Sequence, residues 1–141
     1  MKVEFFQGTD GKLDSNSIKA GVYRISIYSD VDREKVIPLY IGESYCMIKR
    51  GGEHLYNVQK SPSYLGLTEE TYADDSLVLS FEVYEVIEEC WSNTKERDLV
   101  LEKHELDALA KVHPVSQYET NDHVMRNAVE IVSTAIKEKL K

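Results

Sequence analysis

The chain has 141 residues, 42% of them hydrophobic and 30% charged, which is ordinary for a globular domain large enough to bury one core. No apolar run is long enough for a membrane helix, the first residues lack the apolar stretch of a signal peptide, and the two cysteines form no CxxC pattern. We therefore expect a single cytoplasmic domain over residues 1–141, with reduced thiols.

The net charge of −8 argues against indiscriminate binding to a polyanion. The acidity is local, however. Residues 61–90 hold eight acidic residues and no Lys or Arg, which leaves 17 acidic and 17 basic residues in the rest of the chain. A positively charged cleft outside this acidic segment is therefore compatible with the composition.

Four stretches are rich in β-branched and aromatic residues or alternate apolar and polar residues, as strands do. The polar residues 29–35 between the second and third stretches indicate a hairpin loop. Pro38 cannot donate a backbone hydrogen bond, so it favours an edge position or a bulge in the third strand. The predicted strands are residues 2–7, 21–28, 36–42 and 77–87.

A first helix is predicted over residues 43–58, between the third and fourth strands. Gly51 and Gly52 in its middle each cost about 1 kcal/mol relative to alanine and favour a kink or a break there. If the helix continues through them, Arg50 and His54 share one face. Strands and helices in this order predict an α+β layer domain.

Two further helices follow the last strand. One begins at a cap on Asn93 or the next residue, has Glu96 as in a capping box, and ends before Pro114. Its expected apolar face is Leu99, Leu106, Leu109 and Val112. The other begins after a cap at Asn121 or Asp122 and covers about residues 122–140. Its expected apolar face is Met125, Val129, Val132 and Ile136.

Two tripeptides on adjacent predicted strands carry the functional signal: Gly21-Val22-Tyr23 and Tyr40-Ile41-Gly42. Arg50 follows the second tyrosine by ten residues, and His54 follows Arg50 by four. In this order and at these intervals, the residues resemble the motifs of the GIY-YIG nuclease family. The resemblance covers about residues 20–121.

The family also carries a glutamate on a later helix, commonly preceded by leucine, and an asparagine soon after a proline. Glu102 follows Leu101 and is the candidate glutamate, with Glu105 as the fallback. Asn121 is the candidate asparagine, although it comes seven residues after Pro114 and is equally well explained as a helix cap. Tyr64 and Tyr72 lie where some family members carry another helper residue.

The resemblance implies a small, mostly antiparallel three-stranded sheet flanked by helices, here with an N-terminal strand and a C-terminal helix added. It implies a metal-dependent endonuclease that hydrolyses DNA phosphodiester bonds with one Mg²⁺ or Mn²⁺. Tyr23 would position or deprotonate the water, Tyr40 and Arg50 would bind the phosphate, and His54 would assist Tyr23. Glu102 would hold the metal, while Gly42 and Asn121 would contact the substrate.

This chemistry is consistent with the residue types. Arginine offers a planar fork of donors to a phosphate, and a hard cation needs only one carboxylate if waters complete its shell. A tyrosine, with an ordinary pKa near 10, needs help to act as a base. RNA presents the same phosphate chemistry, so the sequence does not separate it from DNA. The chain leaves no evident second DNA-binding domain, so target choice would come from its loops, its last helix, a second copy or a protein partner.

Each residue taken alone has an ordinary structural explanation, as a sheet tyrosine or a surface arginine, histidine or glutamate. A different function class is therefore also considered. In this alternative, the fold is a catalytically silent interaction module whose acidic residues 61–90 bind a basic partner or mimic nucleic acid. A nuclease site should gather the motif residues, Glu102 included, around one concave surface with room for a metal. An interaction module could leave Glu102 remote from the tyrosines or place the acidic segment across the cleft.

Overall fold

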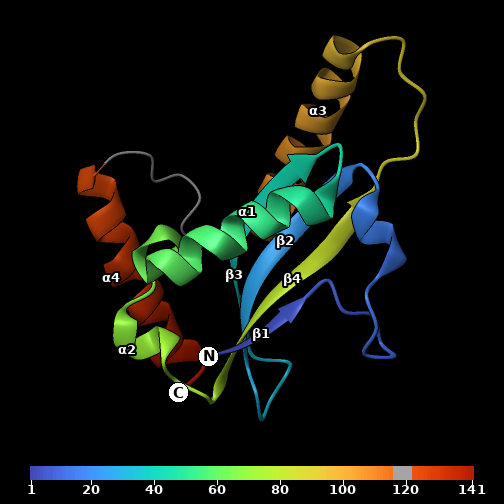
Figure 1. The fold of residues 1–141 in the computed structure, drawn as a ribbon. Helices are drawn as coiled ribbons and strands as arrows, with labels where there is room; N and C mark the ends of the chain where they lie inside the picture. Colours follow the sequence, from blue (N-terminus) through green and yellow to red (C-terminus); the bar gives the residue numbers. More distant parts are fainter. Residues whose placement is uncertain (116–121) are drawn as a thin grey trace.

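The computed structural model describes the backbone of residues 1–115 and 122–141, and the side chains of the last helix from Ala128 onward. Within this part, four strands form one mixed sheet with the order β1-β4-β2-β3 (Figure 1). The predicted α+β class is confirmed, but the sheet has four strands because β1 pairs parallel to β4 along its edge. The strands are β1 (Lys2–Phe5), β2 (Gly21–Ser29), β3 (Val36–Ser44) and β4 (Leu77–Val86).

The hairpin of β2 and β3 sets the positions of the two motif tyrosines. Tyr23 pairs with Gly42, and Ile25 pairs with Tyr40, so both tyrosines extend from the same face of the sheet. The next pair is Ser26 with Pro38, so the register shifts by one residue on β3, as in a β-bulge. Pro38 thus lies on an edge strand and beside a bulge, as its chemistry predicted.

Helices follow the predicted order, but the first begins later than expected. The backbone from Gly42 to Ser44 continues β3 because it pairs with the start of β2, and this long-range pairing outweighs the local helical pattern. The helix then runs without interruption through both glycines. The helical elements are η1 (Ser15–Ile18), α1 (Met47–Lys60), η2 (Pro62–Leu65), α2 (Glu69–Tyr72), α3 (Thr94–Val112) and α4 (Asp122–Lys139).

Gly51 is explained by a close contact with the N-terminal segment. A Cβ atom on Gly51 would lie 2.5 Å from the Phe6 ring, whereas a Cβ on Gly52 would meet nothing within 4 Å. Phe6 is 1% exposed and has a φ of 48°, because the chain turns there at the end of β1 and brings the ring under α1. Gly51 thus allows α1 to approach the sheet, which brings the side chains of this helix to the strands.

Each face of the sheet carries its own apolar cluster. On one face, side chains of α1, η2 and α4 pack against β2 and β3 around Tyr23, Ile25 and Leu39. On the other, α3 packs against Val22 and Ile41. Figure 1 shows α1 lying across the sheet, with α4 beside its C-terminal end. No helix in the described part of the chain is long and apolar enough to cross a membrane.

The buried face of α3 differs from the predicted one. Leu99 and Leu106 are 59% and 58% exposed, whereas Leu109 is buried as predicted and is joined by Leu101 and Ala108. The helix offers two rows of leucines at helical spacing, and sequence alone did not decide which row meets the sheet. The consequence is functional, because Glu105 lies on the same row as Leu101 and Ala108, whereas Glu102 does not.

Candidate active site

Tyr23 lies at the centre of the candidate site. Its side chain is 1% exposed, and its hydroxyl oxygen occupies space next to Gly42, where an added Cβ would be only 2.3 Å away. Burial, followed by the nearby Tyr40, raises the pKa of Tyr23 far above its ordinary value of 10.0, so the phenol is neutral. Gly42, predicted to contact substrate, thus has a packing role beside this hydroxyl.

His54 reaches Tyr23 from α1. Its Nε2 lies 2.7 Å from the Tyr23 hydroxyl, and its Nδ1 lies 2.8 Å from the hydroxyl of Tyr64. Burial and, to a smaller extent, Arg50 lower the pKa of His54 from 6.5 to about 4. A neutral imidazole therefore bridges two tyrosine hydroxyls, one of which donates while the other accepts. The tautomer of His54 determines which tyrosine is the donor.

Tyr40 packs against both of these residues. Its ring centroid lies 4.7 Å from that of His54 and 6.2 Å from that of Tyr23, and the two phenol rings are inclined by 28°. Burial raises the pKa of Tyr40, as does Glu105, while the charge and a hydrogen bond of Arg50 act in the opposite direction. Tyr40 is half-buried, so its hydroxyl lies between the buried Tyr23 and the more exposed Arg50.

Arg50 lies one turn before His54 on α1, as predicted for an uninterrupted helix. Its Nη1 donates to a Glu53 carboxylate oxygen at 2.5 Å, and this hydrogen bond raises the pKa of Arg50. The arginine side chain is 43% exposed, so the guanidinium also faces solvent. The positive charge of Arg50 acts on both tyrosines and opposes the rise in their pKa values.

The structure brings Glu105, rather than Glu102, to the tyrosines. Glu105 is half-buried and acts electrostatically on both Tyr23 and Tyr40. Burial and the neighbouring Glu43 raise the pKa of Glu105, although a backbone hydrogen bond from Glu43 partly offsets this. Glu102 is exposed, and its charge raises the pKa values of Glu43 and Glu105. The fallback residue therefore occupies the position expected of the motif glutamate.

Oxygen ligands, rather than histidine or thiol groups, are what this site offers to a metal. Within the described residues, no three His, Cys, Asp or Glu side chains converge into a group that could hold an ion. Glu105, with Glu43 beside it, fits a hard cation whose shell is otherwise filled by waters and phosphate oxygens. Asn121, predicted to contact substrate, lies outside the described residues.

Tyr64 and Glu43 complete the site but were not assigned roles from sequence. Tyr64 and Tyr72 were indistinguishable candidates, and only the hydrogen bond to His54 selects Tyr64. The hydroxyl of Tyr72 is instead hydrogen-bonded to Gln59. Glu43 directly follows the second tripeptide, but nothing in the sequence indicates that α3 packs beside it. Both contacts depend on how helices dock on the sheet.

The acidic residues of 61–90 lie on several elements. They are distributed over α2, the loop before β4, β4 itself and the loop that follows it. Several are paired with cations from distant parts of the chain, such as Glu82 with Arg24 at 3.1 Å and Glu88 with Lys19 at 3.0 Å. Asp74 also pairs with Lys141.

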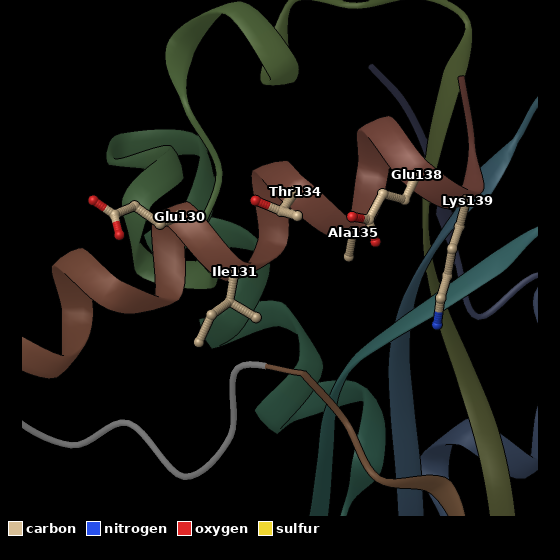
Figure 2. A pocket seen from close by; sticks show the side chains of 6 residues that line it. All are labelled: Glu130, Ile131, Thr134, Ala135, Glu138 and Lys139. Atoms are coloured by element: carbon tan, nitrogen blue, oxygen red, sulfur yellow. The ribbon is translucent and has the colours of Figure 1, made fainter.

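A hollow on α4 is separate from these residues. Figure 2 shows the side chains that line it, all of which belong to α4 and none of which is a motif residue. Their mixed charges form no catalytic arrangement. They are Glu130, Ile131, Thr134, Ala135, Glu138 and Lys139.

Comparison of the chain with protein-family models, curated proteins and solved structures found no match. The resemblance to the GIY-YIG nucleases therefore stays a prediction that depends on the residues of this chain and on their arrangement.

Proposed function

We propose that the chain is a metal-dependent endonuclease of the GIY-YIG type, which hydrolyses DNA phosphodiester bonds. The observation that carries the proposal is the convergence of Tyr23 on β2, Tyr40 on β3, Arg50 and His54 on α1, and Glu105 on α3. The antiparallel pairing of β2 with both β3 and β4 supports the proposal, because the resemblance implies a mostly antiparallel three-stranded sheet. In this proposal β1 is an addition to its edge.

The proposed role of Tyr23 is to accept a proton from the attacking water. A neutral phenol is a weak base, so it must pass its own proton on as it receives one. His54 Nε2, 2.7 Å away, is suited to take that proton because burial keeps the imidazole neutral. The water oxygen then forms a bond to phosphorus, the bond to the leaving oxygen breaks, and solvent protonates that oxygen.

The proposed role of Arg50 and Tyr40 is to bind the scissile phosphate. The guanidinium offers several donors in one plane and is partly exposed, while Tyr40 supplies a hydroxyl at the boundary of the buried site. Charge that develops on the phosphoryl oxygens would thus meet donors that are already positioned. The ion pair with Glu53 orients the Arg50 side chain before substrate binds.

Glu105 is the proposed metal ligand, in place of Glu102. Its carboxylate is partly desolvated and has another carboxylate, Glu43, beside it, so a divalent cation would relieve an unfavourable environment. Mg²⁺ or Mn²⁺ bound there would neutralise charge on the phosphate and the leaving oxygen. The proposed partner is DNA, and RNA serves as a comparison because its phosphates are chemically the same.

The test is a cleavage assay on supercoiled plasmid and on an RNA of matched length, with Mg²⁺, Mn²⁺ or EDTA. We expect metal-dependent nicking or linearisation of the DNA. Tyr23→Phe and Glu105→Gln should each lower the rate by about 10²-fold or more, because each removes a group that acts on the reacting atoms. Glu102→Gln is the matched control on the same helix and should stay within a few fold of wild type.

The outcomes separate the parts of the proposal. Loss of activity in Glu102→Gln but not in Glu105→Gln would return the metal to Glu102. Activity that persists in Tyr23→Phe would remove this tyrosine from the reaction. Wild-type protein that cleaves neither nucleic acid with any metal would contradict the enzymatic function.

A further inference from the structure

The outer face of α1 carries exposed tyrosines and lysines in alternation. Tyr45, just before the helix, and Tyr56 are 50% and 64% exposed, and Lys49 and Lys60 follow them by four residues each. At helical spacing these four residues and Gly52 lie along one side, opposite the buried residues of the helix. We call Tyr45, Lys49, Gly52, Tyr56 and Lys60 the outer stripe.

Cations lie against both exposed rings of the outer stripe. Lys49 Nζ lies 3.0 Å from the Tyr45 hydroxyl oxygen and 5.6 Å from its ring centroid, and Lys60 Nζ lies 5.9 Å from the Tyr56 centroid. Arg97 reaches the same surface from α3, with its Cζ 4.7 Å from the Tyr45 centroid. Two elements distant in sequence therefore contribute positive charge to one aromatic surface.

The sign of this charge is unusual for the molecule. The chain has a net charge of −8, but α1 contains Lys49, Arg50 and Lys60 against a single acidic residue, Glu53. Glu53 forms an ion pair with Arg50 and its charge also acts on Lys49, so α1 keeps an excess of positive charge over its single carboxylate. The stripe is thus suited to an anionic partner rather than to a basic one.

We propose that the outer stripe binds a single-stranded segment of nucleic acid, with phosphates on Lys49 and Lys60 and unpaired bases on the rings of Tyr45 and Tyr56. Exposed aromatic rings interleaved with cations are typical of single-strand binding, because a duplex keeps its bases stacked and unavailable. The helix rises roughly 14 Å between its first residue, Met47, and Tyr56, a length that an extended strand can span.

The position of Arg50 connects this surface to the candidate site. Arg50 lies on the flank of α1 between the outer stripe and the buried side, next to Tyr40. A strand that follows the stripe would pass this arginine and present a phosphate to Tyr23. The inference rests on the proposed nuclease function, because it takes the bound strand to be the substrate. It specifies that this substrate has an unpaired segment near the cleavage point.

The test measures binding of a fluorescently labelled 12-nucleotide oligothymidylate by anisotropy, in EDTA, over a range of salt concentrations. Replacing both lysines, Lys49→Gln with Lys60→Gln, should weaken binding at least tenfold. It should also reduce the slope of log affinity against log salt by about 1.4, because two phosphate contacts are lost. The matched control, Lys12→Gln with Lys35→Gln, makes the same charge change at exposed lysines elsewhere and should behave as wild type.

The contribution of the rings is tested separately. Tyr56→Ala should weaken binding about fivefold or more through loss of base stacking. Tyr84→Ala, which removes an exposed tyrosine on β4, is the control and should have no effect. Equal binding by the two lysine variants, or tighter binding of a duplex than of the single strand, would overturn the inference.

The binding and cleavage experiments can contradict one proposal without contradicting the other. Single-strand binding that depends on the outer stripe, without cleavage under any metal condition, would keep this inference and contradict the nuclease function. Cleavage that is unaffected by loss of Lys49 and Lys60 would keep the nuclease function and contradict this inference.

Discussion

The residue that connects most of the candidate site is His54. Its two ring nitrogens contact the hydroxyls of Tyr23 and Tyr64, and its ring packs against Tyr40. A buried imidazole with both nitrogens hydrogen-bonded has a fixed orientation, and its tautomer decides which hydroxyl donates. Tyr64 therefore acts on Tyr23 through His54, as a positioning residue.

Removing the Tyr64 hydroxyl should disturb the site without removing any group proposed to touch the substrate. In Tyr64→Phe, Nδ1 of His54 loses its partner, and we expect the cleavage rate to fall about 10-fold or more. The ¹⁵N chemical shifts of the His54 ring should also change, because they report the tautomer. Tyr72→Phe is the control, since Tyr72 bonds to Gln59. Unchanged His54 shifts in Tyr64→Phe would contradict the positioning role.

The low pKa of His54 predicts a dependence of stability on pH. The unfolded chain binds a proton at this histidine near pH 6.5, whereas the folded chain does so only near pH 4. This contribution to the free energy of unfolding is therefore complete above pH 6.5 and is lost as the pH falls towards 4, by about 3 kcal/mol. Urea unfolding at several pH values measures it.

His54→Gln provides the comparison, because only the difference between the two proteins isolates this histidine. The raised pKa values of Glu43 and Glu105 act with the opposite sign above pH 4.5, and they are present in both proteins. We expect the variant to lose less stability than wild type between pH 6.5 and 4. Parallel pH profiles would show that His54 does not titrate as described.

At the scale of elements, α1 is positioned by one of its two glycines. Gly51→Ala should lower the free energy of unfolding by about 1–3 kcal/mol, because the new methyl group would overlap the buried Phe6 ring. Gly52→Ala, in the next position of the same helix, should raise it by about 0.5–1 kcal/mol, because alanine is the better helix former and nothing obstructs it. Urea unfolding of both variants checks the difference in sign.

The contact between Gly51 and Phe6 shows which features of α1 sequence could predict and which it could not. The two glycines were expected to interrupt α1 because propensity is a local property. The reason for Gly51, a ring from the N-terminal segment, is a contact between residues 45 positions apart in the chain. Local sequence patterns correctly identified the four strands and the three longest helices but not the short elements η1, η2 and α2.

Helix orientation was the part that sequence could not predict. The row of α3 that meets the sheet is decided by the surface formed by Val22 and Ile41, and this surface exists only after the strands pair. Glu102 was the first candidate for the metal ligand because it follows Leu101, and the sequence did not show that Glu105 is the one whose charge reaches both tyrosines. By contrast, Tyr23, Tyr40, Arg50 and His54 were predicted together because their spacing is local and their elements are adjacent.

At the scale of the whole molecule, α4 is part of the core rather than an appendage. Val132, Ile136 and Leu140 are buried in the same cluster as Tyr23. On the opposite face of the sheet, Trp91 packs against the cluster that contains Leu101. The two clusters share the strands between them, so we expect them to unfold together.

Ile136→Ala tests this cooperativity. The variant should lose about 2–5 kcal/mol of the free energy of unfolding, because it leaves a cavity in the core. The unfolding midpoint should fall equally by far-ultraviolet circular dichroism and by fluorescence of Trp91, although this residue is on the other face. Ile131→Ala, at a 42% exposed position of the same helix, should change stability by no more than about 0.5 kcal/mol. Different midpoints for the two probes would indicate independent units.

The close approach of the Tyr23 hydroxyl to Gly42 has a consequence for how this chain can diverge. A Cβ at position 42 cannot coexist with the phenol oxygen, which would be 2.3 Å away. During divergence, a larger residue at 42 is tolerated only after the side chain at 23 has shortened. The two positions are therefore epistatic, and the order of substitution is fixed. The Tyr40 ring, 2.8 Å from the same Cβ, must also move. A descendant that keeps both tyrosines in place must therefore keep the glycine.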